Sequence, residues 1–262
     1  MKIIGLPALV GSYDNYIWLL VKQEMVWVID PGQAQPVLNY LASHSLNLAG
    51  ILITHYHHDH VDGIAELKKQ FPAARVYGPQ KTPNNLIEQR LVDGDEVSLF
   101  DDYHLKVIET PGHTYDHIAY YNQQDLFCGD TLFGAGCGRQ FDGGYDAFAK
   151  SLLKLRALPD GLNFYSAHEY TLSNLKFAQF ADPSNVDLQN RIATTHIEYP
   201  QPLVAPQSTL KLEKATNPFL RFDQLPIQET LLARGAQNTP ESLFKTLRDW
   251  KDHIDQKGYP AK

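Results

Sequence analysis

Residues 54–60 of this 262-residue chain concentrate side chains that bind metal ions. They read Thr-His-Tyr-His-His-Asp-His and directly follow a short apolar run that predicts a buried strand. A strand end holds the backbone rigidly, while the loop beyond it is free to turn side chains inward. His55 and His57 are two residues apart and can face one metal ion. Asp59 and His60 follow a turn and can face a second ion. Imidazole nitrogen and carboxylate oxygen are ligands that zinc, iron and manganese accept.

The alternative interpretation of this segment is a polar helix N-terminus, with Asp59 as its cap and the histidines facing water. Four histidines and one aspartate within six residues, directly after an apolar strand, disfavour that alternative. His58 is the exception, because we expect it to point away from the metal ions.

Three further segments each place one metal-binding side chain directly after a predicted strand. His113 lies in Thr-Pro-Gly-His-Thr, Asp130 in Cys-Gly-Asp-Thr and His168 in Ser-Ala-His-Glu. Each segment alone is a weak signal, since a histidine after a strand is more often structural and Gly-Asp is a common turn. Their shared position after strands makes them candidates to complete one site. His117 follows His113 by four residues and is a candidate to support the site from behind.

Strands and helices alternate over the first two thirds of the chain, and helices dominate afterwards. Strands are predicted at 15–21, 25–29, 50–53, 75–77, 105–108, 118–121, 126–128 and 164–165, and helices at 36–44, 64–71 and 145–158. Beyond Glu169 we find no convincing strand; helices are predicted at 172–180, 186–197, 210–215 and 242–254, with proline-bearing loops between them. We therefore expect a catalytic domain over 1–168 and a small helical domain over 169–262.

Composition and charge exclude several classes of protein. The net charge of -7 argues against a nucleic-acid-binding protein, which usually carries a basic surface. Cys128 and Cys137 are too few for a disulfide framework, and this favours a reducing compartment. The apolar run at residues 3–10 is short, broken by Pro7 and without a cleavage site, so we expect no secretion signal. A cytoplasmic monomer that binds neither nucleic acid nor membrane is the expectation.

Together these motifs resemble the metallo-β-lactamase superfamily and, within it, the glyoxalase II (hydroxyacylglutathione hydrolase) family. The resemblance rests on His-x-His-x-Asp-His, Pro-Gly-His-Thr, Gly-Asp-Thr-Leu-Phe and Ala-His-Glu-Tyr-Thr, and residues 136–139, 174–178 and 217–221 extend it over almost the whole chain. It implies an α/β fold, the αββα sandwich of that superfamily, followed by a small all-α C-terminal domain that binds substrate. It also implies hydrolysis of S-D-lactoylglutathione to glutathione and D-lactate by a metal-bound hydroxide, the second step of methylglyoxal detoxification.

The resemblance implies seven ligands for two divalent metal ions, with zinc as the first choice and iron or manganese as alternatives. The ligands would be His55, His57 and His113 for one ion, Asp59, His60 and His168 for the other, and Asp130 as a bridge. Two divalent ions against two carboxylates and five neutral imidazoles leave a net positive centre, which favours a bound hydroxide. Asp59 and Asp130 are accordingly the candidate catalytic residues.

The substrate expectation rests on the leaving group and on the binding groove. A thiol has a pKa near 8.5, so a thiolate can leave a tetrahedral intermediate without a dedicated general acid. For the glutathione moiety, the resemblance points to Arg139, Tyr170, Arg248 and Lys251. Arg248 and Lys251 share a face of a predicted helix, for which a solvated helix face is the alternative. Some family members carry a tyrosine two residues after the position of Arg139, where this chain has Phe141 and lacks the hydroxyl.

The metal motif alone leaves other activities on the same scaffold open. The bridging Asp130 disfavours a β-lactamase. A flavo-diiron oxidoreductase is disfavoured because a resemblance to that class would require a glutamate at the position of His57. The net charge of -7 disfavours a tRNA-processing nuclease. A persulfide dioxygenase or a lactonase is harder to exclude. Residues 217–221 and the pair of Arg248 and Lys251 favour the thioester hydrolase over these two. A non-catalytic metal-binding or partner-binding protein is disfavoured, because an intact ligand set with open positions marks catalytic sites.

Overall fold

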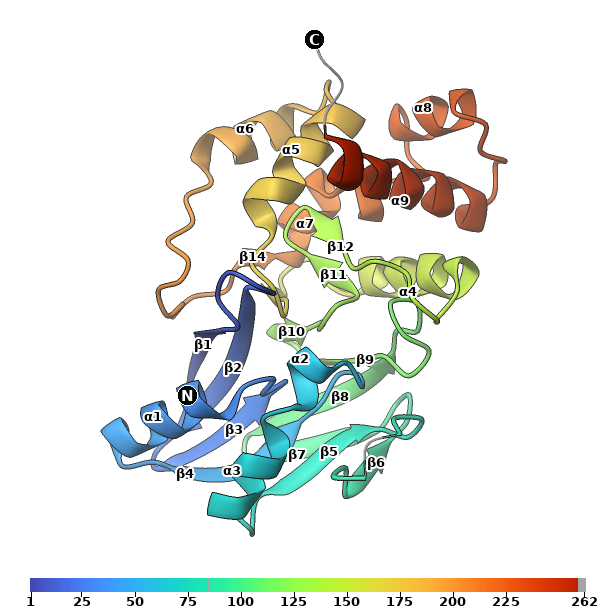
Figure 1. Ribbon diagram of the computed structural model, residues 1–262. Helices are drawn as coiled ribbons and strands as arrows, with labels where there is room; N and C mark the ends of the chain where they lie inside the picture. Colours follow the sequence, from blue (N-terminus) through green and yellow to red (C-terminus); the bar gives the residue numbers. More distant parts are fainter. Residues whose placement is uncertain (84, 259–262) are drawn as a thin grey trace.

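Apolar strands that alternate with turns give this chain two β-sheets that pack face to face, as the computed structural model shows for residues 1–83 and 85–258 (Figure 1). The first sheet has the order β1 (Lys2–Ala8), β2 (Asn15–Lys22), β3 (Met25–Ile29), β4 (Asn47–Leu52), β5 (Arg75–Pro79) and β6 (Gln89–Leu91). The second sheet has the order β14 (Ser208–Thr209), β13 (Asn163–Tyr165), β10 (Asp125–Phe127), β9 (Ile118–Tyr121), β8 (Tyr103–Glu109) and β7 (Glu96–Phe100). A separate hairpin of β11 (Leu132–Phe133) and β12 (Gly136–Cys137) follows β10.

Helices pack on the outer faces of the two sheets and, toward the C-terminus, against one another. They are α1 (Ala34–His44), α2 (His58–Val61), α3 (Ile64–Gln70), α4 (Tyr145–Ala157), α5 (Thr171–Ala181), α6 (Val186–Thr194), α7 (Leu210–Thr216), the 3-10 turn η1 (Pro218–Leu220), α8 (Ile227–Ala233) and α9 (Pro240–Lys257). Trp18 and Phe127 belong to the core between the sheets. Val37 of α1 and Leu67 of α3 pack on the outer face of the first sheet. The layers confirm the predicted αββα sandwich with helices after it.

Several strands were not predicted from the sequence, among them β1, β6, β11, β12 and β14. β1 contains Gly5 and Pro7, which strands usually avoid, but β1 is an edge strand, where proline is tolerated. The outer edge of β1 is partly covered, since Gly5 and Leu203 exchange backbone hydrogen bonds of 2.7 and 2.9 Å. The expectation of no strand beyond Glu169 is wrong at β14, which pairs with β13. A strand of two residues has no alternation that a sequence pattern could reveal.

The division at residue 168 stays a prediction, and the two parts of the chain share a hydrophobic core. One cluster of buried side chains contains Phe148 and Phe164 from the first part and Phe177, Phe219 and Phe244 from the second. The rings of Phe148 on α4 and Phe244 on α9 lie 4.9 Å apart. Figure 1 shows α5 to α9 gathered at one end of the molecule, next to the β11–β12 hairpin. Among the described residues, no helix combines the length and the apolar character that crossing a bilayer requires.

Candidate metal centre

The loops that carry the predicted metal ligands meet at one edge of the sandwich. β10 and β13 run parallel, so the loops after them leave the second sheet on the same side. The loop after β4 joins them, because Ile118 N donates to Thr54 O at 2.9 Å. The loop after β13 is tied to β2 by a bridge between Asn15 and His168. Segments far apart in the sequence are therefore held side by side by backbone hydrogen bonds.

Within the first motif, residues His58–Val61 form the one-turn helix α2. The helix-terminus alternative was thus right for the backbone but wrong for the side chains, since Asp59 and His60 are buried rather than solvated. His58 points away as predicted; it is exposed and its Nε2 lies 3.1 Å from the Tyr13 hydroxyl. Gly32 allows the backbone after β3 to pack directly against α2, because a Cβ at residue 32 would lie 1.7 Å from the carbonyl oxygen of Asp59.

The seven predicted ligands form three overlapping groups, and within each group the ligand atoms lie within 4.8 Å of one another; the group of His55, His60 and Asp130 links the other two. In one of these two, His57 Nδ1 lies 3.1 Å from His55 Nε2 and 2.9 Å from His113 Nε2. In the other, Asp59 Oδ2 lies 3.5 Å from the Nε2 atoms of both His60 and His168. Tetrahedral zinc with Zn–N bonds of ~2.0–2.1 Å separates its ligand atoms by about 3.3 Å. The observed spacing therefore suits metal coordination.

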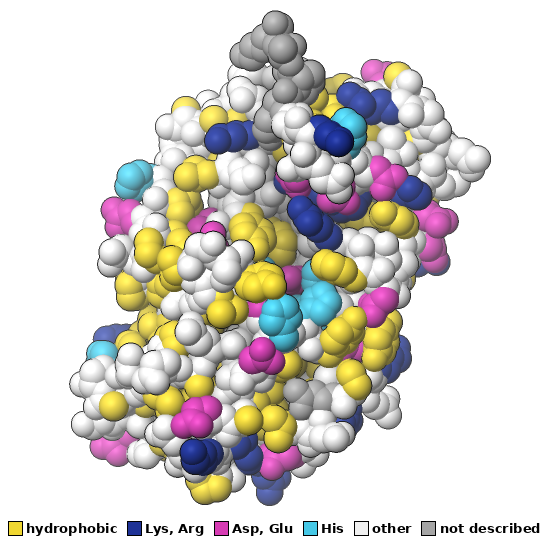
Figure 2. Space-filling model, in the orientation of Figure 1, with side chains coloured by type: hydrophobic (Ala, Val, Ile, Leu, Met, Phe, Trp, Pro, Cys, Tyr) yellow, Lys and Arg dark blue, Asp and Glu magenta, His cyan; other side chains and the backbone are white. Residues whose placement is uncertain are grey.

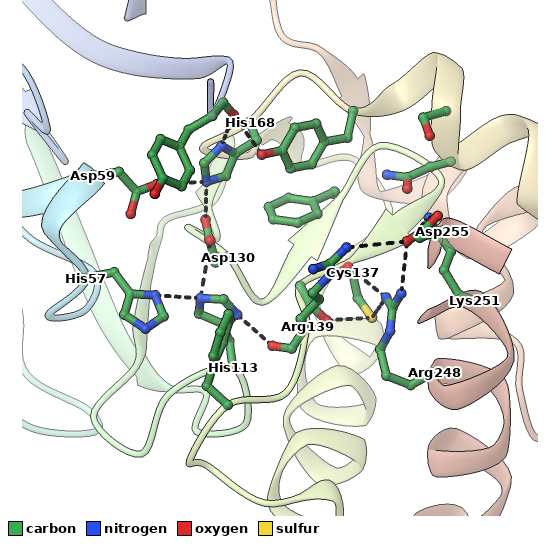
Figure 3. A pocket seen from close by; sticks show the side chains of 17 residues that line it. His57, Asp59, His113, Asp130, Cys137, Arg139, His168, Arg248, Lys251 and Asp255 are labelled. Carbon is green, nitrogen blue, oxygen red and sulfur yellow. Dashed lines mark hydrogen bonds and ion pairs between the residues drawn. The ribbon is translucent and has the colours of Figure 1, made fainter. Parts of the chain in front are cut away.

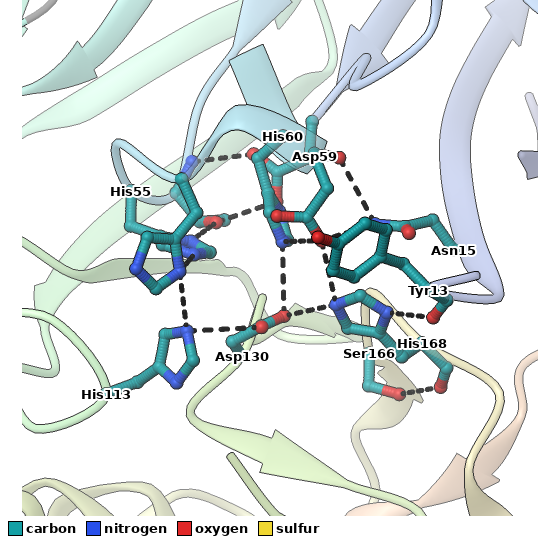
Figure 4. Close-up of polar contacts among 12 residues, drawn as sticks. Tyr13, Asn15, His55, Asp59, His60, His113, Asp130, Ser166 and His168 are labelled. Atoms are coloured by element: carbon teal, nitrogen blue, oxygen red, sulfur yellow. Dashed lines mark hydrogen bonds and ion pairs between the residues drawn. The ribbon is translucent and has the colours of Figure 1, made fainter. Parts of the chain in front are cut away.

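Asp130 lies between the two groups (Figure 4). Its Oδ2 is 3.3 Å from His113 Nε2, on the side of the first group. Its Oδ1 is 3.4 Å from His60 Nε2 and 3.1 Å from His168 Nε2, on the side of the second. One carboxylate thus presents one oxygen to each group, which is the arrangement that a bridging ligand requires.

Backbone and side-chain acceptors behind the histidines orient the rings. His113 Nδ1 and His168 Nδ1 each lie 2.7 Å from a backbone carbonyl oxygen, that of Arg139 and Tyr13 respectively. Because a carbonyl can only accept, Nδ1 carries the proton in both rings and Nε2 is left free for a metal ion. His60 Nδ1 lies 3.0 Å from Asp30 Oδ2, and Asp30 in turn accepts a hydrogen bond from Thr54 N at 2.8 Å.

Sequence reasoning missed these supporting residues. In the sequence, Asp30 stands in the turn-forming segment Asp-Pro-Gly and Asn15 begins a predicted strand. Neither position indicates that Asn15 Nδ2 donates to Asp59 Oδ2 at 3.3 Å or that Asp30 supports His60. Tyr13 acts through its backbone oxygen, for which residue type gives no signal. By contrast, His117 lies behind the site as predicted: it accepts from Asp130 N at 3.0 Å and its ring stacks on that of His55.

The electrostatics of the cluster fit a divalent cation. Burial lowers the pKa of the His55 imidazole, and it lowers that of His113 to about 4, so both rings are neutral and can act as ligands. Burial alone would raise the pKa of Asp130, but the imidazoles around it hold this pKa well below its usual range. His60 Nε2 and Asp130 Oδ1 are buried, and within the described residues their contacts of 3.1–3.5 Å with other atoms of the cluster do not have hydrogen-bond geometry. Buried nitrogen and oxygen atoms without hydrogen bonds can act as metal ligands, and they mark the cluster as a divalent-metal site.

A pocket of about 410 Å³ opens directly beside the cluster. Histidines of the cluster line it at one end, and a group of cations lies at the other, as Figures 2 and 3 show. Tyr170 stacks on His168, with ring centroids 4.9 Å apart, and its hydroxyl donates to Tyr13 O at 2.7 Å. Phe141, which is 58% exposed, sets its ring edge-on to those of His57 and His113. All four predicted substrate-binding residues line this pocket.

Arg248 and Lys251 are buried, at 1% and 5% exposure, so the solvated-face alternative for this part of α9 is wrong. Arg248 Nη1 donates to Cys137 O at 3.1 Å, and this bond ties α9 to the β11–β12 hairpin. Lys251 Nζ donates to both carboxylate oxygens of Asp255, at 2.8 and 2.9 Å. Burial lowers the pKa of the Lys251 ammonium, and its hydrogen bond to Asp255 opposes that shift.

Two family descriptions together match residues 11–254 of this chain. Residues 11–168 match the metallo-beta-lactamase superfamily, and residues 169–254 match the hydroxyacylglutathione hydrolase C-terminus. Hydroxyacylglutathione hydrolase of Hydrogenovibrio crunogenus is 41% identical over 262 residues, which cover 98% of this chain and 96% of that protein. The chain belongs to the hydroxyacylglutathione hydrolase family. The hydroxyacylglutathione hydrolase of Photobacterium profundum is 45% identical over 242 residues, which cover 92% of this chain and 96% of that protein.

Solved structures of the superfamily share the fold of this hydroxyacylglutathione hydrolase family member. ETHE1 from Myxococcus xanthus superposes with a TM-score of 0.65 at 22% identity, over 99% of this chain and 100% of that chain. TTHA1623, solved in a di-iron-bound form, superposes with a TM-score of 0.56 at 25% identity, over 82% of this chain and 99% of that chain. The predicted family and fold are thereby confirmed, while the roles of individual site residues stay predictions.

Proposed function

We propose that this protein hydrolyses the thioester of S-D-lactoylglutathione and related 2-hydroxyacylglutathiones, releasing glutathione and the hydroxy acid. The observation that carries the proposal is the placement of Asp130 between two groups of metal ligands, beside a pocket with cations at its far end. The relatives named hydroxyacylglutathione hydrolase match nearly the whole chain, so their substrate is the natural candidate.

We infer that the site takes two divalent ions, one at each group, with Asp130 as the shared ligand. Zinc suits the nitrogen-rich donor set, and iron or manganese would also be accepted. The di-iron form of TTHA1623 supports both the count and the alternative metal. When bound, such ions would polarise the thioester carbonyl and make hydroxide available at neutral pH.

The chain's own residues would hold and orient the substrate. Arg139 and Lys251 would attract a carboxylate of the glutathione moiety, and this places the thioester at the end of the pocket that contains Asp130. Tyr170 and Phe133 form an aromatic wall along the pocket, with ring centroids 5.4 Å apart. The leaving thiolate needs no proton from the chain, because its conjugate thiol has a pKa near 8.5.

Steady-state kinetics with glutathione thioesters, lactones and persulfides would test the proposal, with elemental analysis of the same sample. We expect thioester turnover to dominate. Faster turnover of a lactone or a persulfide in fully metallated protein would refute the thioesterase assignment. The monomeric state and the cytoplasmic location stay predictions that nothing in this fold decides.

Arg139→Ala is expected to raise KM for the glutathione thioester about tenfold, with little change in kcat. Its side chain is 60% exposed, so truncation costs little stability, while a charged hydrogen bond is worth ~1.5–3 kcal/mol before solvent screening. Binding that is equal in the ground and transition states appears in KM alone. A large loss of kcat at constant KM would contradict a binding role for Arg139.

Phe141→Tyr is expected to lower KM about two- to tenfold, because it adds a hydroxyl at an exposed position of the pocket rim. One net hydrogen bond is worth ~0.5–1.5 kcal/mol. Phe180→Tyr, at an exposed position of α5 that does not line the pocket, is the matched comparison. An unchanged KM for Phe141→Tyr would show that the substrate passes this position without a polar contact.

A further inference from the structure

Three cations of the pocket converge on one carboxylate, that of Asp255 in the last turns of α9 (Figure 3). Lys251 Nζ donates to both of its oxygens, at 2.8 and 2.9 Å. Arg248 Nη2 lies 3.9 Å from Asp255 Oδ2, and Arg139 Nη2 lies 4.0 Å from the same atom. Arg139, Arg248 and Lys251 come from two separate segments of the chain, yet a single acidic side chain faces all three. Asp255 itself lines the pocket.

We propose that Asp255 is an internal competitor for the substrate carboxylate and sets the affinity of this pocket for anionic thioesters. The proposal rests on the proposed function, which places a glutathione carboxylate at the same cations. A substrate carboxylate at the Lys251 ammonium and the adjacent guanidinium groups would repel the carboxylate of Asp255. We therefore expect substrate binding to weaken or break contacts of Asp255 with these cations.

The surroundings of Asp255 allow such a displacement. Its side chain is 25% exposed, whereas that of Lys251 is 6% exposed, so the carboxylate can turn toward water while the ammonium stays in place. Arg248 keeps a separate partner, since its Nη2 donates to Asp252 at 2.9 Å. Asp255 can thus leave without stripping Arg248 of all its contacts.

Charge explains why the competitor would matter for selectivity. Arg139, Arg248 and Lys251 face Asp252 and Asp255, so the cluster keeps one net positive charge if all five groups are ionised. One excess charge favours a ligand with a single carboxylate at this end of the pocket. Without the negative charge of Asp255, the cluster would bind anions more tightly and would discriminate less among them.

Asp255→Asn tests the inference, with Asp255→Glu and Asp249→Asn as controls. Asp255→Glu keeps the negative charge, and Asp249 lies on the outside of the same helix, where it pairs with Lys245. KM and kcat would be measured with S-D-lactoylglutathione and with its glycine ethyl ester, and the dissociation constant of free glutathione by calorimetry. We expect Asp255→Asn to lower both KM and the glutathione dissociation constant about three- to tenfold, the scale of one partly screened ion pair.

The gain should vanish for the ethyl ester, in which the glycine carboxylate is masked while that of the γ-glutamyl residue stays free, and neither control should reproduce it. An unchanged or raised KM for Asp255→Asn would overturn the inference, because it would mean that Asp255 orders the cations or binds the substrate ammonium. Wild-type protein that turns over no thioester would refute the proposed function instead. The glutathione titration reports on Asp255 in either case.

Discussion

Asp130→Asn is expected to lower kcat/KM for a glutathione thioester at least about a thousandfold and to reduce bound metal in the same sample. Charge stabilisation by metal ions supplies several kcal/mol, and each 1.36 kcal/mol is a tenfold change in rate. Asparagine keeps the volume of the side chain but offers only one oxygen and no charge. The oxygen facing His113 and the one facing His60 and His168 could not both remain ligands.

Kinetics and elemental analysis would be performed on Asp130→Asn and on Asp146→Asn, an exposed position on α4 that pairs with Lys150. The second variant controls for the loss of one negative charge. Two metal equivalents with full activity in Asp130→Asn would refute the bridging role. Loss of activity with both metal ions retained would place the contribution of Asp130 in charge rather than in metal affinity.

The metal ligands could be predicted from the sequence because their residue types are rare in such a pattern and because each follows a strand. β10 and β13 are parallel neighbours, so Asp130 and His168 had to lie near each other once these strands were paired. His55 follows β4 of the other sheet, and its loop joins them through the hydrogen bond from Ile118 N to Thr54 O. The residues behind them could not be predicted in this way. Asp30 and Asn15 look like ordinary turn and strand residues, and their roles depend on distances that only the folded chain sets.

Fold prediction succeeded where an element had several periods of its pattern. The amphipathic α9 and the hairpin of β2 and β3 are examples. It failed for β14, a strand of two residues, and for β1, whose glycine and proline are tolerated because the strand lies at the sheet edge. The burial of α9 could not be predicted from its residues either. Lys251 and Asp255 look like a surface pair at i and i+4, yet they line a pocket.

Removal of bound metal by a chelator is expected to abolish thioester turnover and to lower the thermal stability of the protein. Asp59 and Asp130 are buried, and without a metal ion only the imidazoles around them, among them those of His60 and His168, would offset their charges. A ligand at a hundred times its dissociation constant stabilises the folded state by ~2.7 kcal/mol, which corresponds to roughly 5–10 °C in Tm for a chain of this size.

Reloading the metal-free protein with zinc, iron(II) or manganese in measured amounts would show how many ions activity requires and which metals support it. We expect activity and Tm to recover together up to two equivalents per chain, because the two ligand groups share Asp130 and neither is complete without it. Full recovery of both quantities at one equivalent would refute the two-ion proposal and leave a single-ion site. Turnover that persists in metal-free protein would refute metal dependence itself. The histidines of the cluster would then be buried polar groups without a role as catalytic metal ligands.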